Sequence, residues 1–155
     1  MGGKSHVEGS KNIALENNSH AEGNETFAAG AHSHAEGNHT TAIGNSAHAE
    51  GMETCAVGKA SHAEGIRAFA IGDYSHAEGV NVEVAGQFSH GEGIDIKILE
   101  GTVASHAEGS NNTIEGSYSH AEGYNNVAEK AHTHIEGTNN HSYAECSHLE
   151  GNNNQ

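Results

Sequence analysis

The sequence contains no proline and no tryptophan, and aromatic residues make up only 5% of its 155 residues. Hydrophobic residues reach 34%, and many of these are alanine. A conventional globular core needs large apolar side chains, since each one that is buried contributes roughly 1.5–3 kcal/mol. The composition therefore argues against a compact domain built around a core of that kind.

Basic residues are also scarce. Six Lys and Arg stand against 21 Asp and Glu, which gives a formal net charge of −15 with the 15 His neutral. A charge of this sign argues against nucleic acid and against anionic membrane surfaces as direct partners. Protonation of the histidines would cancel most of the charge, so pH is a variable that matters for this chain.

Cysteine and long apolar runs are nearly missing as well. Cys55 and Cys146 lie far apart and match no CxxC or zinc pattern, so we expect two free thiols. No run approaches the roughly 18 apolar residues of a membrane span, so no membrane insertion is expected. The start, Met1 to Lys4, lacks an apolar segment, so we expect no signal peptide in this segment. We interpret residues 1–4 as a linker or cloning remnant, and the chain as a piece of a longer protein.

What the sequence does have is a repeat. The motif Ser-His-Ala-Glu-Gly, with small variations, occurs in eleven copies at a spacing of 14 residues, with one step of 16. Each copy carries a His and, two residues later, a Glu that is followed by Gly. We call these pairs the His/Glu ladder: His6, Glu8, His20, Glu22, His34, Glu36, His48, Glu50, His62, Glu64, His76, Glu78, His90, Glu92, His106, Glu108, His120, Glu122, His134, Glu136, His148 and Glu150.

A second, weaker half-motif lies seven residues after the first, as in Thr40-Thr41-Ala42-Ile43-Gly44. Gly and Asn tolerate the positive φ of tight turns, and Asn pairs such as Asn111-Asn112 join the pieces. Short alternating pieces with such corners are typical of strands. We therefore predict turns at Gly23, Gly30, Gly37, Gly44, Gly51, Gly58, Gly65, Gly72 and Gly79.

Two short strands per 14 residues predict an all-β fold, a parallel β-roll or β-solenoid. Eleven coils would cover residues 5–151 as one unit, with an insertion near 94–104 and a tail at 152–155. At about 4.8 Å per coil, the rod would be on the order of 50 Å long. The irregular segment 94–104 is either a functional bulge or a tolerated surface loop.

Alternate side chains of a strand face opposite sides. We expect Ser, Thr and Ala to fill the interior, because two short strands cannot enclose anything larger. A buried Ala methyl contributes about 0.8 kcal/mol, whereas ordering a residue costs about 1–2 kcal/mol in backbone entropy. Such a thin core predicts oligomerisation through an outer face. The invariant His/Glu ladder is the favoured seam, and the alternative is the face formed by Phe27, Ile43, Val57, Phe69 and Ile71.

Thr40-Thr41-Ala42-Ile43-Gly44 and the Ser, Ala and Gly of the main motif resemble the Ser-Val-Ala-Ile-Gly head repeats of YadA-type trimeric autotransporter adhesins. The resemblance covers nearly the whole chain and implies a left-handed parallel β-roll in a parallel homotrimer. The Ser-His-Ala-Glu-Gly arrays also resemble those of phage tail-fibre and prophage proteins. The resemblance thus implies a structural or adhesive segment of a fibre on a bacterial cell or a virion. The family's matrix binding is not carried over, and the sequence names no receptor.

Where the family places apolar Val and Ile toward the trimer axis, this chain has His and Glu. If that placement holds, the axis is lined by rings of three His and three Glu. Such rings could hold a Zn- or Ni-like ion, and His32/His34 and His132/His134 add local pairs. The alternative is that His and Glu hydrogen-bond each other. A pair that recurs in every coil favours structure, so we expect no cofactor and no resident metal.

Catalysis is not expected, since eleven equivalent pairs define no unique site and no nucleophile or cofactor motif occurs. The remaining alternative is a metal-binding or pH-responsive solenoid. Histidines held protonated by Glu would stabilise the fold in acid. Neutral histidines would give the opposite trend.

Overall fold

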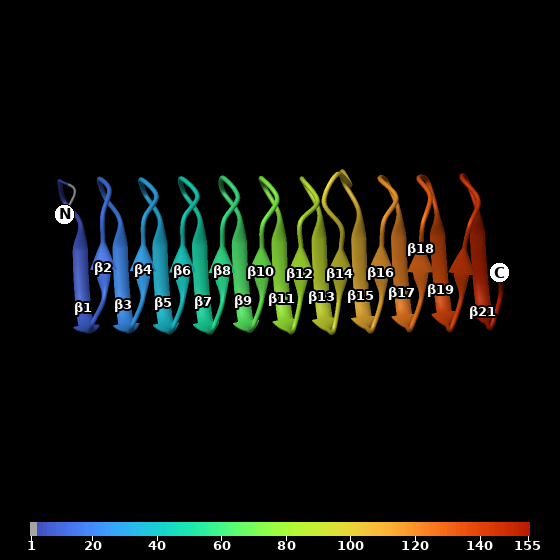
Figure 1. The fold of residues 1–155 in the computed structure, drawn as a ribbon, viewed down its shortest axis with the longest axis horizontal. Helices are drawn as coiled ribbons and strands as arrows, with labels where there is room; N and C mark the ends of the chain where they lie inside the picture. The colour runs from blue at the N-terminus through green and yellow to red at the C-terminus, as the bar shows by residue number, and fades with distance from the viewer. Residues whose placement is uncertain (1–2) are drawn as a thin grey trace.

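The structure, a computed structural model, describes residues 3–155 as a rod of stacked coils with the two termini at opposite ends (Figure 1). Each coil has one five-residue and one two-residue strand, which form an 11-stranded and a 10-stranded parallel sheet. The predicted all-β parallel solenoid is confirmed. Among residues 3–155 there is no helix that could span a membrane.

The long strands are β1 (His6–Ser10), β3 (His20–Asn24), β5 (His34–Asn38), β7 (His48–Met52), β9 (His62–Ile66), β11 (His76–Val80), β13 (His90–Ile94), β15 (His106–Ser110), β17 (His120–Tyr124), β19 (His134–Thr138) and β21 (His148–Asn152). The short strands are β2 (Ile13–Ala14), β4 (Phe27–Ala28), β6 (Thr41–Ala42), β8 (Cys55–Ala56), β10 (Phe69–Ala70), β12 (Glu83–Val84), β14 (Lys97–Ile98), β16 (Thr113–Ile114), β18 (Val127–Ala128) and β20 (His141–Ser142).

Each strand pairs with the equivalent strand of the next coil, so identical residue types stack along the rod. His20 lies opposite His34 and Glu22 opposite Glu36. The strand register is kept across the 16-residue step, as the pairing of His90 with His106 shows. The two extra residues are absorbed in the turn between β14 and β15, where the Thr102 amide and hydroxyl both donate to the Leu99 carbonyl at 3.3 and 2.8 Å.

The interior confirms the predicted inward set, since Ser19, Ala21, Thr26 and Ala28 and their equivalents are buried. The expectation that nothing larger fits is wrong. Val82, Val84, Ile96, Ile98, Ile114 and Ile135 are all fully or almost fully buried. The interior of a coil can thus exchange small for large side chains where a neighbouring position gives up volume.

Buried polar groups in the interior are mostly tied to the backbone. The Ser33 hydroxyl donates to the Gly30 carbonyl at 2.7 Å, and Ser61 and Ser75 repeat this contact. The serine of the repeat therefore fastens the turn that precedes each long strand. The hydroxyls of Thr26, Thr40 and Thr54 are exceptions, since they are buried without a hydrogen-bond partner.

Sequence reasoning treated the Asn pairs only as turn residues, and it missed half of their role. The first Asn of each pair does stand at positive φ, as at Asn125. The second is buried, and Asn126 donates to the carbonyls of Glu122 and Gly137 at 2.7 and 2.9 Å. Its side-chain oxygen also accepts the Asn140 amide at 3.0 Å. The signal in the sequence is the recurrence of the whole pair at 14-residue spacing.

The glycines predicted at turns fall into two sets. Gly30, Gly44, Gly58 and Gly72 open the turns before the long strands, whereas Gly23, Gly37, Gly51, Gly65 and Gly79 lie inside the long strands. Both sets are required by close approach: a Cβ at Gly23 or Gly30 would lie 2.1 Å from the carbonyl oxygen of Gly37 or Gly44, respectively.

Positive φ occurs at the glycines of the long strands, such as Gly23 at 114°, and also at one non-glycine corner residue in each half-coil. Glu25 at φ 57° and His32 at φ 59° are examples. The sequence predicted Gly or Asn at such corners. Stacking holds other residues there, because each corner amide donates to the coil before it, as Glu25 does to Ser10 at 2.9 Å.

Candidate functional site

The His/Glu ladder runs the length of the 11-stranded sheet. His opens every long strand and Glu occupies its third position, so both point to the outer face while the residue between them points inward. The structure thus brings all eleven predicted pairs into two parallel columns. The registered pairing of successive coils leaves each His beside the His of the next coil.

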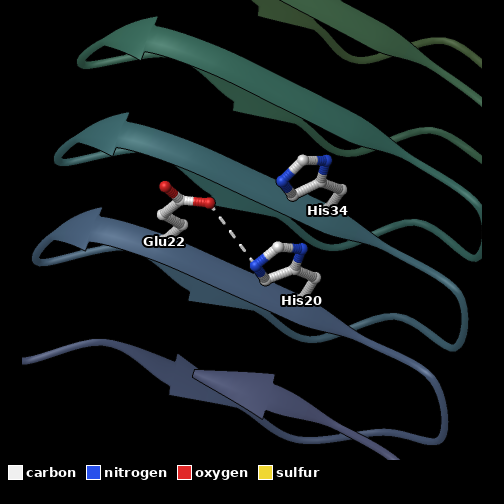
Figure 2. A group of neighbouring side chains, drawn as sticks. All are labelled: His20, Glu22 and His34. Carbon is white, nitrogen blue, oxygen red and sulfur yellow. Dashed lines mark ion pairs between the residues drawn. The ribbon is translucent and has the colours of Figure 1, made fainter. Parts of the chain in front are cut away.

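The imidazole rings form a stack. From His20 to His120, successive ring centroids are 4.5–5.0 Å apart, and their planes agree within 8°. The parallel stacking ends in the first coil and one coil before the last, where the His6 and His134 rings turn edge-on to their inner neighbours. Figure 2 shows the unit that repeats, with the rings of His20 and His34 side by side and Glu22 reaching toward them.

In eight of the eleven coils the Glu lies near the His of its own coil without a hydrogen bond to it. The His Nε2 to Glu Oε2 distance is 3.6–4.0 Å in the eight coils from His6 to His106. Distances this long are electrostatic contacts rather than hydrogen bonds. The predicted His–Glu pairs are therefore close in space, but their atoms are too far apart for a hydrogen bond.

The ladder leaves polar atoms without partners. The side chains are only partly covered, with His34 34% and Glu36 48% exposed. The Nε2 atoms themselves are buried and lack a hydrogen-bond partner at His20, His34, His48, His62, His76, His90, His106 and His120. Buried polar atoms without partners are costly, so a single chain presents this face in an unsatisfied state.

The electrostatics favour the neutral form at three rings of the stack. Partial burial lowers the pKa of His48, His76 and His120 below the ordinary 6.5. Charge on the neighbouring histidines lowers these pKa values further, and the nearby glutamates oppose the shift more weakly. Of the two alternatives drawn from the sequence, the structure of the single chain therefore favours neutral histidines at these three positions.

The ladder also groups possible metal ligands. One ligand atom from each of His20, Glu22 and His34 lies within 4.8 Å of the others, and equivalent groups recur along the rod. Zinc–nitrogen bonds are about 2.0–2.1 Å, so the rings would have to rotate to share an ion. His32 and His132, which the sequence paired with His34 and His134, stand at exposed left-handed corners off the ladder.

Two other outer surfaces carry apolar side chains. The outer face of the short strands exposes Ile43, Phe69 and Ile71 toward the N-terminal half of the rod. In the next two short strands the outward position is charged, with Glu83 in β12 and Lys97 in β14. The other surface was not predicted from the sequence. It is formed by the last residue of the long strand in four successive coils, which is exposed and apolar at Met52, Ile66, Val80 and Ile94.

Comparison with known families agrees with this geometry. Residues 35–61, 49–75 and 63–81 match the family model described as the YadA head domain repeat. This chain contains YadA-type head repeats. The matched segments span less than a third of the 155 residues, and the coils on both sides continue the same strand register. The YadA-type repeat is a structural rather than a catalytic unit. No curated protein gives a significant match.

Proposed function

We propose that this chain is a structural and adhesive segment of a homotrimeric surface fibre, with the His/Glu ladder as the seam between subunits. The carrying observation is the row of eight buried Nε2 atoms without partners on a face that never varies. A neighbouring chain could supply the missing partners, and its presence would remove the partly exposed glutamates from water. The YadA-type repeats support the trimeric fibre.

The interior supports the same proposal. It consists mainly of Ala methyls and small hydroxyls, with larger side chains confined to a few coils. Small side chains remove little apolar area from water, so the outer faces are the remaining source of stability. The apolar column at Met52, Ile66, Val80 and Ile94 lies on the same long strands as the ladder, which extends the surface available to a neighbour.

Sedimentation equilibrium tests the trimer, for which we expect a mass about three times the 16.0 kDa of the chain. Glu64→Lys places a charge of opposite sign in the ladder and should weaken the trimer. Glu83→Lys makes the same change on the short-strand face and should leave it intact. A monomeric, folded wild type would refute the proposal. Loss of the trimer in Ile71→Lys but not in Glu64→Lys would move the seam to the short-strand face.

The fibre could belong to a phage or prophage tail or to a bacterial adhesin. We place it at the surface of a virion or cell on the strength of its repeats, with a receptor still to be identified. A binding assay with fluorescently labelled trimer separates the two hosts. Binding to bacterial cells would indicate a phage or prophage tail, whereas binding to extracellular matrix or animal cells would indicate a bacterial adhesin.

A metal-binding solenoid is the second candidate, and the grouping of His20, Glu22 and His34 favours it. Isothermal titration of the chelator-treated protein with Zn²⁺ or Ni²⁺ tests it. Saturable binding that is lost when the ladder histidines of β3 and β5 are changed to Gln would support the candidate. As a control, a variant that lacks only the corner residues His32 and His132 should bind the metal as the wild type does. A titration without saturable, stoichiometric binding would refute the metal-binding candidate.

A further inference from the structure

A column of corner residues runs along the edge where each short strand turns into the next long one, the upper edge in Figure 1. In part of the rod this column is aromatic. The rings of Tyr74 and Phe88 stack at 4.9 Å with 6° between their planes, and those of Tyr118 and His132 stack at 5.2 Å with 7°. These four residues are exposed at the surface. We call them, with Ala104 between the two stacks, the corner ladder.

Ala104 occupies the corner between the two stacks and carries no ring. Its φ of 52° matches the 53° of Phe88 and the 56° of Tyr118. The backbone register through it is also unbroken, because the Ala104 amide donates to Gln87 at 2.9 Å just as the Tyr118 amide donates to Val103 at 2.8 Å. The ladder therefore has one missing ring, and Phe88 and Tyr118 stand two coil steps apart, about 9.6 Å.

A gap of this height has room for one ring. A single ring placed between Phe88 and Tyr118 would lie at nearly the separations of 4.9 and 5.2 Å that the two existing stacks show. Its floor would be Ala104, an exposed small residue. The two walls are aromatic, which suits a ligand with flat apolar faces.

The edge of the gap is polar because of the two-residue insertion. The insertion borders a surface groove whose lining includes Gln87, Glu100 and Val103, the residues beside and before Ala104 in the turn. On the other side, the Ser117 hydroxyl accepts the Val103 amide at 3.1 Å and keeps its own proton to donate. The groove is not lined by Phe88, Ala104 or Tyr118, but Gln87, Val103 and Ser117 directly precede these three residues in the chain, so groups that can hydrogen-bond lie next to the gap.

We propose that the gap at Ala104 binds one pyranose ring of a neutral glycan. A sugar ring has apolar C–H faces for Phe88 and Tyr118 and hydroxyl groups around its rim for Gln87, Glu100 and Ser117. The neighbouring groove holds Asp73, Glu83 and Glu100 against the single cation Lys97, and this negative charge beside the gap disfavours acidic sugars. This assignment also gives the 16-residue coil a role, since its insertion forms the polar side of the site. It requires that the corner edge stays open in the assembly, whether the His/Glu face or the short-strand face forms the trimer seam.

The test uses the full chain and a panel of neutral methyl glycosides, namely glucoside, galactoside, mannoside and N-acetylglucosaminide, with saturation-transfer NMR as the readout. We expect at least one glycoside to bind with a Kd in the millimolar range, as is usual for one small ring. Phe88→Ala and Tyr118→Ala should each weaken binding by about threefold to tenfold, the effect of one stacking contact.

The sharpest variant is Ala104→Tyr, which inserts the missing ring from the chain itself. Tyrosine is tolerated at the equivalent corners Tyr74 and Tyr118, so this variant should fold and lose glycoside binding. Ala60→Tyr is the matched control, because it adds a ring at the corner before Tyr74 and leaves the gap open.

The proposal is overturned if no neutral glycoside in the panel binds, if binding survives Ala104→Tyr, or if sialic acid methyl glycoside binds better than all of them. It is also overturned if Tyr118 is shielded from solvent quenchers in the assembled protein, since a neighbouring chain would then fill the gap. Sedimentation of each variant separates these results from a failure of the trimer.

Discussion

Gly91 lies against Val84, and the size of each residue determines the size of the other. A Cβ at position 91 would lie 2.7 Å from Cγ2 of Val84 and 3.2 Å from the side chains of Val82 and Ile96. In seven of the other ten coils this position is Ala, as at Ala77 and Ala107. Where the short strand contributes a larger interior residue such as Val84, the long strand therefore has Gly91 in place of Ala, which is one methyl group smaller.

Gly91→Ala should consequently destabilise the fold by about 1–3 kcal/mol, the usual result of overpacking a filled interior. Val84→Ala in the same chain should restore part of this loss, because it removes the methyl that Cβ would meet. Urea unfolding of the two single variants and the double variant measures the coupling. Strictly additive effects would show that the two residues do not share this space.

The buried asparagines should contribute more than their exposed partners. Asn126→Ala removes two donated bonds and one accepted bond, so we expect a loss of about 3 kcal/mol. Asn126→Thr, which installs the residue found at the same interior position in Thr26 and Thr40, should lose less. Thermal melts of both variants check this order, and equal melting temperatures for Asn126→Ala and the wild type would contradict it.

At Thr40, a less polar residue should increase the stability of the fold. Its hydroxyl is buried without a partner, and valine has nearly the same shape. Thr40→Val should stabilise the chain by about 1–2 kcal/mol by removing an unsatisfied polar atom. Ser33→Ala is the contrasting variant, since that hydroxyl donates to Gly30 and its loss should destabilise. Unfolding midpoints in urea distinguish the two, and a destabilised Thr40→Val would mean that the hydroxyl has a partner such as bound water.

The period of the repeat was sufficient to predict the fold. Eleven copies at one spacing require one coil each, and the alternation within Ser-His-Ala-Glu-Gly assigns Ser and Ala to the interior. Two details were out of reach because they depend on contacts between coils. The corner at Glu25 is held by its bond to the previous coil, and the space for Val84 exists only because Gly91 is small.

The candidate site was predictable in its membership but not in its geometry. The sequence placed every His and Glu of the ladder on one face, and the structure does the same. It could not distinguish a hydrogen bond from the observed separations of 3.6–4.0 Å, nor foresee that the rings stack on one another. Both follow from side-chain rotation, which a spacing of 14 residues does not restrict.

The histidine stack makes stability depend on pH, and its sign follows from the lowered pKa values. The groups that face His76 are the rings of His62 and His90 and the carboxylates of Glu64, Glu78 and Glu92. Because burial and the two rings lower the pKa of His76 below 6.5, the unfolded chain binds protons more readily than the folded one. The stabilisation is complete above pH 6.5 and is lost as the pH falls through the folded-state pKa. Thermal melts should therefore show a lower melting temperature at pH 5 than at pH 8. The variant with His48, His76 and His120 all changed to Gln should show a smaller difference, whereas His32→Gln, at an exposed corner, should keep the full one. A melting temperature that rises in acid would mean that assembly holds these histidines protonated against glutamate.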